Sequence, residues 1–219
     1  MATRLLLVEL ATLYQAQSGR ALDLIAVGGV DAAKRIQAGE AFDLVFLAAD
    51  AMHKLAQSGH VLPDSLVPLA VSGVAVAVPA GAPVPDLSTE ASVKQAVLAA
   101  PVVSYSTGPS GTALLALLDH WGIAQQMQGR LLQAPPGVPV GELVAQGRAA
   151  LGFQQLSELM HLSGITVAGT LPASIAIDTT FCGAVAAVST HAQAAREVLA
   201  FMGSAQASEA KHRQGMRPA

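Results

Sequence analysis

The sequence predicts an α/β protein made of two lobes, the first of which is discontinuous. Helical and strand-like patterns alternate from the beginning of the chain, as in sheets with helical crossovers. The richest Pro/Gly cluster, residues 80–85, follows a long apolar strand candidate, Val67–Pro79, and a second such candidate, Ile177–Val188, comes later. We therefore expect lobe 1 to comprise residues 1–78 and 178–219, and lobe 2 to comprise residues 79–177.

The composition indicates a densely packed protein and excludes two classes of partner. Of the 219 residues, 52% are hydrophobic and 12% are charged, enough apolar side chains for a core in each lobe. The 12 Lys and Arg residues form no basic stripe and the net charge is −3, so no nucleic acid is expected to bind. The apolar runs fall far short of the roughly 20 residues that cross a bilayer, so no membrane insertion is expected.

Lobe 1 is expected to open with a helix. Leu6, Leu10, Leu13 and Tyr14 recur at helical spacing until Ser18 and Gly19 end the pattern. The elements expected after it are a strand at Leu22–Val27, a helix at Ala32–Ala38, a strand at Phe42–Leu47 and a helix at Ala49–Gln57. This order predicts a parallel sheet with helical crossovers.

Lobe 2 shows the same alternation. Its expected helices are Ser88–Leu98, Gly111–Trp121 and Gly141–Gln146, and its expected strands are Val102–Tyr105, Leu131–Ala134 and Ala150–Gln154. The chain is then expected to return to lobe 1 through Ile177–Val188 and a helix at Ala192–Met202. The single cysteine, Cys182, lies in this returning strand, where we expect an inert core thiol.

One strand-to-helix turn of lobe 2 has the composition of an anion site. In the stretch Ser104–Thr112 a strand passes through Ser, Thr and Gly residues into a helix. Glycine lets the backbone approach a ligand, and the free N–H groups and dipole of a helix start favour negative charge. We expect Ser106, Thr107, Ser110 and Gly111 to bind a small anion, the alternative being that Ser110 or Thr107 only caps the helix.

Two further turns and one strand end offer similar chemistry. The turns are Gly28-Gly29-Val30 in lobe 1 and Gly137-Val138 in lobe 2, and Gln154 and Gln155 end a buried strand with amides that donate and accept. Ligands of α/β proteins bind at the carboxyl ends of the strands. We therefore expect these residues to complete the ligand site in a cleft between the lobes.

Catalytic and metal-binding patterns are poor. None of the six His residues has an i, i+4 partner of the kind that binds zinc on a helix. The sequence also lacks a Gly-x-Ser-x-Gly elbow and the phosphate loop of nucleotide hydrolases. No catalytic residue, metal site or cofactor is predicted.

Several stretches of the sequence resemble a known family, and the resemblance extends over nearly the whole chain. The stretches that carry the resemblance are 33–40, 42–50, 74–79, Pro109-Ser110-Gly111 and 150–153. In their order and spacing these resemble the periplasmic molybdate-binding proteins of ABC transporters and their wider solute-binding superfamily. The resemblance implies a two-lobed, type 2 periplasmic-binding-protein fold, a ligand cleft between the lobes, a monomer, a periplasmic location and an ABC transporter permease as partner.

Two departures from the family pattern shape the expected ligand and the expected start of the fold. Family members that bind molybdate usually have serines where this chain has Gly28-Gly29-Val30, and often a tyrosine in place of Gln155. The loss of these hydroxyl donors favours a small organic carboxylate or another oxyanion over molybdate as the ligand.

The first strand of lobe 1 is also missing from the family pattern, so we expect a start within a longer gene product or a shortened chain. Glu9 interrupts the first apolar stretch, so no signal peptide is expected in the chain as it stands.

Three functions remain open from the sequence. The first is a solute-binding protein that holds a small anionic ligand. The second is an isomerase of a small polycarboxylate such as aconitate, as in some proteins that resemble the molybdate-binding proteins, a reaction that needs one positioned proton-transfer group. The third is a ligand-binding domain detached from a transcription factor, against which the lack of an N-terminal helix-turn-helix argues.

Overall fold

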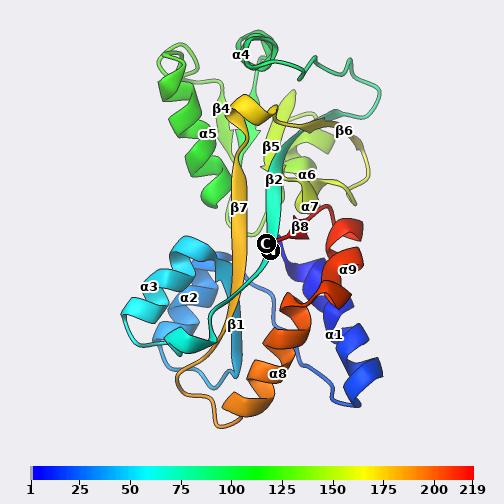
Figure 1. Ribbon diagram of the computed structural model, residues 1–219. Helices are drawn as coiled ribbons and strands as arrows, with labels where there is room; N and C mark the ends of the chain where they lie inside the picture. Colours follow the sequence, from blue (N-terminus) through cyan, green and yellow to red (C-terminus); the bar gives the residue numbers. More distant parts are fainter. Residues whose placement is uncertain (1) are drawn as a thin grey trace. The chain divides into compact units, whose positions relative to one another are not determined.

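The computed structural model describes residues 2–219, and these form two compact units (Figure 1). Lobe 1 runs as far as Ser72 and resumes at Thr179, and lobe 2 is Gly73–Asp178. The strand β2 (Val67–Pro79) contributes its first residues to lobe 1 and its remaining residues to lobe 2.

The sheet of lobe 1 is built around β7 (Asp178–Val185). It pairs antiparallel with β1 (Leu44–Ala48) on one side and neighbours β2 on the other. The short strand β8 (Arg217–Pro218) pairs with β2 through Ala70 and Val71. The parallel sheet expected for this lobe is therefore wrong for β1 and β7.

Helices cover both faces of the lobe 1 sheet because the side chains of β1 alternate between two cores. Val45 and Leu47 pack with α2 (Gly29–Gln37) and α3 (Ala49–Gln57), on one side of β1 in Figure 1. Leu44 and Phe46 pack toward the other side. The helices there are α1 (Arg4–Ser18), α8 (Ala192–Gly203) and the short α9 (Ser208–Arg213).

The sheet of lobe 2 has the strand order β6-β2-β5-β3-β4. In its centre β3 (Val103–Tyr105) is parallel to both β5 (Leu151–Gln155) and β4 (Leu131–Gln133). The strand β2 runs antiparallel to β5 and to β6 (Ile165–Thr170). Three parallel strands therefore end at one common edge of this sheet.

The helices of lobe 2 also form two layers. One layer is α4 (Glu90–Ala99) and α5 (Pro109–His120), whose Leu114 and Leu118 are fully buried against the sheet. The other is α6 (Val140–Ala145) and the one-turn helix α7 (Leu156–Leu159). Short 3₁₀ helices occur at Pro63–Ser65, Ala173–Ile175 and Ala205–Ala207.

Most predicted helices are confirmed with small shifts in their ends, but the strand predicted at Leu22–Val27 is wrong. Residues 20–28 form no helix and no strand. Ile25 is 62% exposed and Leu24 is 38% exposed. An apolar run becomes a strand only where a neighbouring strand pairs with its N–H and C=O groups, and no described strand pairs with this segment. The elements α7, β6 and α9 were not predicted.

Two predictions about the chain's chemistry can be compared with the structure. Cys182 lies in the buried part of β7, and burial raises the pKa of its thiol, as expected of an unreactive core cysteine. No helix within residues 2–219 is long and apolar enough to span a bilayer.

Candidate functional site

The carboxyl edge of the lobe 2 sheet brings three chain turns together. The strand β3 leads through residues 106–108 into α5, β4 leads through residues 134–139 into α6, and β5 runs directly into α7. Because the three strands are parallel neighbours, all three turns lie at the same edge.

The turn into α5 is held by serine hydroxyls. The Ser106 hydroxyl accepts a hydrogen bond from Gly108 N at 3.2 Å and lies 2.9 Å from the Ser110 hydroxyl. Ser110 is buried and Thr107 is exposed. The N-cap residue is Gly108, without a side-chain cap, so neither Thr107 nor Ser110 caps α5 and the plain capping alternative loses its support.

Gly111 shows why this turn needs glycine. A Cβ atom at Gly111 would overlap the carbonyl oxygen of Ser106 and would lie 3.1 Å from the Tyr105 ring. The first turn of α5 therefore packs directly against the backbone of the preceding loop. Such a close approach is possible only without a side chain.

The turn into α6 uses one of the two donors expected there. Gly137 is exposed and has a φ of 80°, which favours glycine. Val138 N donates to the carbonyl of Pro135 at 3.0 Å. The Val138 amide is therefore engaged within the turn.

Gln154 and Gln155 are both buried at the end of β5 but have different surroundings. The Gln154 Oε1 atom accepts a hydrogen bond from Val140 N, the first residue of α6, at 2.8 Å. Since side chains alternate along a strand, Gln155 lies on the same face as Phe153, toward α5. The structure thus ties Gln154 to α6 and separates it from Gln155.

The lobe 1 turn is the start of α2. Gly28 is its N-cap and accepts a hydrogen bond from Ala32 N, and Gly29 and Val30 are the first two helical residues. Val30 is 65% exposed. Asp31 lies in the same first turn and adds a negative charge that the sequence analysis did not weigh.

Three polar residues of lobe 2 were missed by the sequence analysis: Ser104, Ser157 and Glu158. All five buried polar side chains of lobe 2 lie on β3, on β5 or at the starts of the helices that follow these strands: Ser104, Ser110, Gln154, Gln155 and Ser157. The hydroxyls of Ser104 and Ser157 have no hydrogen-bond partner within residues 2–219. The signal that could have found this cluster is its density, since four of the five residues 154–158 are polar, at the end of a buried strand and just beyond it.

Glu158 is half-buried beside this cluster. Burial raises the pKa of its carboxyl, although a hydrogen bond with the Gln154 side chain acts in the opposite direction. In the segments 106–110, 134–139 and 154–160, Glu158 is the only residue with a carboxyl or imidazole side chain.

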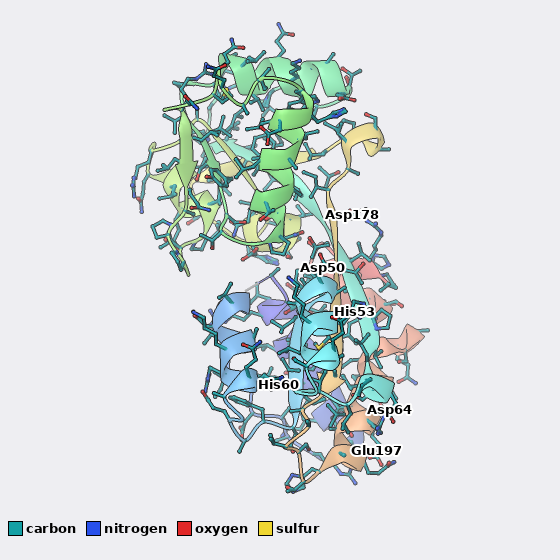
Figure 2. All side chains as sticks on the ribbon, turned by 90° about the vertical axis from the view of Figure 1, so that its left-hand side faces the viewer. Asp50, His53, His60, Asp64, Asp178 and Glu197 are labelled. Atoms are coloured by element: carbon teal, nitrogen blue, oxygen red, sulfur yellow. The ribbon has the colours of Figure 1, made fainter. Side chains whose placement is uncertain are left out.

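The ionisable residues of lobe 1 labelled in Figure 2 form no comparable cluster. Asp64 pairs with Arg196 and Glu197 pairs with Arg20, both at 2.7 Å on the surface. Asp50 and His53 are exposed on α3. Within residues 2–219 no group of three or more His, Cys, Asp or Glu side chains could hold a metal ion.

Comparison with known proteins explains this architecture. The model of the family described as bacterial extracellular solute-binding protein matches residues 1–217. The chain belongs to this family. As a member of the bacterial extracellular solute-binding proteins, it shares the two-lobed α/β fold of the periplasmic molybdate-binding protein of Azotobacter vinelandii. The TM-score to that structure is 0.80 at 21% identity, covering 98% of this chain and 95% of that one.

One further solved structure and one curated protein are similar to this chain. The sulfate-binding protein SubI of Mycobacterium tuberculosis has a TM-score of 0.76 at 19% identity, over 99% of this chain and 83% of that one. An aconitate isomerase of Pseudomonas sp. is 36% identical over 215 residues, which are 96% of this chain and 82% of that protein.

Proposed function

We propose that this solute-binding protein holds a small organic anion with more than one carboxylate. The observation that carries the proposal is the set of buried neutral polar side chains at the carboxyl edge of the lobe 2 sheet. Neutral hydrogen-bond donors and a helix N-terminus bind anions without a fixed opposite charge. Each hydrogen bond to a charged group contributes about 1.5–3 kcal/mol, so a few such bonds hold the ligand reversibly.

The proposed contacts divide between two ends of the ligand. One carboxylate is bound by the turn Ser106–Gly111, where the Ser106 and Ser110 hydroxyls are 2.9 Å apart. A second polar group reaches Gln155, whose amide both donates and accepts. The turn Gly28–Val30 of lobe 1 is proposed as a further contact through its backbone N–H groups.

The proposal also includes the setting in which the protein works. By family, it is expected outside the cytoplasm, in the periplasm, where it delivers its ligand to an ABC transporter permease. The chain shares its fold with molybdate-binding and sulfate-binding proteins, but it has Gly28, Gly29, Val30 and Gln155 where hydroxyl donors are expected in a molybdate site. A carboxylate is therefore favoured over molybdate.

An isomerase of a small polycarboxylate is a second candidate. It is supported by the 36% identity with an aconitate isomerase over nearly the whole chain and by the half-buried Glu158 carboxyl beside the polar cluster. Both candidates require the same class of ligand, so one screen addresses the binding step of both.

The test is a thermal-shift screen of the purified protein followed by calorimetry. Molybdate, tungstate and sulfate are compared with citrate, cis-aconitate, trans-aconitate and tricarballylate. At a hundredfold excess over Kd, a true ligand stabilises the folded state by about 2.7 kcal/mol, a rise in Tm of roughly 5–10 °C for a chain of this size. Submicromolar binding of molybdate without a shift from any carboxylate would overturn the proposal.

A further inference from the structure

We propose that Glu158 is the proton-transfer group of this site, acting on an unsaturated polycarboxylate bound at the carboxyl edge of lobe 2. The inference rests on the proposed polycarboxylate site and assigns a chemical role within it. Its basis is a side-chain arrangement confined to lobe 2.

The first step of the argument is elimination. The three segments at this edge supply Ser, Thr, Gln and glycine residues, which bind anions but do not carry protons between carbon atoms near neutral pH. Glu158 is the only carboxyl or imidazole group among them. Within these three segments, a proton shift therefore has one candidate group.

The second step is positioning. Glu158 hydrogen-bonds with the Gln154 side chain, and the oxygen of that side chain accepts from Val140 N at 2.8 Å. Gln154 is 4% exposed and fixed between β5 and α6. The carboxyl is thus oriented by an amide that is itself held by backbone, the arrangement expected of an acid or base with an orienting partner.

The third step is the state of the group. Partial burial of Glu158 in α7 disfavours the charged carboxylate and raises the pKa of this carboxyl. A carboxyl shifted in this direction holds a proton more readily, as a group that returns a proton must. Beside it, Ser157 is buried and its hydroxyl has no partner within residues 2–219. A ligand carboxylate would supply an acceptor for that hydroxyl.

The chemistry balances without a further reactant. The Glu158 carboxylate takes one proton from the methylene carbon beside the double bond of a propene tricarboxylate. The electron pair of that C–H bond forms a new double bond, and the original π pair spreads onto the conjugated carboxylate. Glu158 then returns the proton to the former alkene carbon, so the double bond moves by one position and its geometry is set anew.

The experiment follows proton exchange and binding in the same variants. Wild type is incubated with cis-aconitate in D₂O, and ¹H NMR measures both deuterium incorporation and formation of the trans isomer. Calorimetry measures binding of tricarballylate, the saturated analogue, which cannot react. The variants are Glu158→Gln, Glu158→Asp and the control Glu142→Gln, an exposed carboxyl in the first turn of α6.

We expect Glu158→Gln to bind tricarballylate within about threefold of wild type and to lose exchange by 100-fold or more, within the 10²–10⁴ range of general acid–base catalysis. Glu158→Asp keeps the carboxyl at a shorter reach and should retain part of the rate, and Glu142→Gln should match wild type. Retained binding shows that the Gln variant is folded.

The outcomes separate the two proposals. Wild-type protein that binds tricarballylate without exchanging protons, or Glu158→Gln that exchanges at the wild-type rate, overturns the role of Glu158 and leaves carboxylate binding standing. Wild-type protein that binds none of the carboxylates overturns the proposed function itself.

Discussion

At the residue scale, the crowding around Gly111 makes the turn into α5 sensitive to a single methyl group. Gly111→Ala places a Cβ against the Ser106 carbonyl oxygen, and we expect overpacking to cost about 1–3 kcal/mol of folding free energy. Gly108→Ala is the matched control, because its Cβ would find Ser106 Oγ at 3.6 Å, an ordinary contact. Urea unfolding of both variants measures the difference, and equal midpoints would contradict it.

Gly29 tests the proposed contact from lobe 1. A Cβ at this position would meet Leu47 Cδ2 at 3.8 Å, so the fold has room for a side chain. We expect Gly29→Val to keep the Tm within a few degrees and to lose ligand binding, because the branched side chain stands where the anion would approach the α2 N-terminus. Unchanged affinity in calorimetry removes this turn from the site.

Lys211 gives a prediction about pH. It is 1% exposed, no acidic side chain pairs with it within residues 2–219, and burial lowers the pKa of its ammonium group. The unfolded chain therefore binds this proton at a higher pH than the folded chain does, so Lys211 reduces stability as the pH falls below its ordinary pKa of about 10.4. We expect Lys211→Met to raise the Tm at pH 7 by about 2–4 °C, for about 1 kcal/mol.

The gain from Lys211→Met should shrink as the pH approaches 10. Differential scanning calorimetry of wild type and variant across this range measures the trend. A gain that stays constant with pH would show that lost charge is not its cause, and a lower Tm at pH 7 would show that the lysine stabilises the fold.

At the element scale, the segment 20–28 shows how tertiary context overrides local pattern. Five of the six residues in Leu22–Val27 are apolar, yet no described strand pairs with this segment. By contrast, β1 pairs with β7 through five residues. We expect Ile25→Ser to change the unfolding free energy by less than about 0.5 kcal/mol. Leu47→Ala, 5% exposed in β1, should cost about 2–5 kcal/mol. Similar losses of unfolding free energy in the two variants would indicate that residues 22–27 form the strand that the sequence predicted.

The candidate site shows which of its residues could be predicted from the sequence and which could not. The composition of the turn Ser106–Gly111 predicts an anion site, which stays a prediction. Parallel strands predict that such turns share one edge, and the parallel pairing of β3 with β4 and β5 confirms this. The hydrogen bond from Val140 N to Gln154 Oε1 could not be predicted from the sequence. It joins residues 14 positions apart and depends on the packing of α6 on β5. Glu158 was missed because a lone acidic residue after a strand has no motif, and its burial depends on α7, which is too short for a periodic signal.

At the scale of the whole molecule, the sequence predicted two α/β lobes and nearly all long helices, since each helix carries its own apolar stripe. The direction of β1 against β7 could not be read from local pattern, because these strands are separated by more than a hundred residues. The same separation hid the pairing of β8 with β2 at the end of the chain. Long-range pairing, which a local pattern does not encode, accounts for both differences.

The continuity of β2 leads to the last prediction, which concerns cooperativity. Each lobe has its own core, but β2 pairs with β8 before Ser72 and with β5 and β6 after Gly73. Unfolding either lobe therefore frees part of a strand that the other lobe needs. We expect Leu118→Ala in lobe 2 and Leu55→Ala in lobe 1, both fully buried, each to lower one shared transition, at a cost of about 2–5 kcal/mol. Calorimetry should give a van't Hoff enthalpy equal to the calorimetric one in both variants, whereas a second transition in either variant would show that the lobes unfold separately.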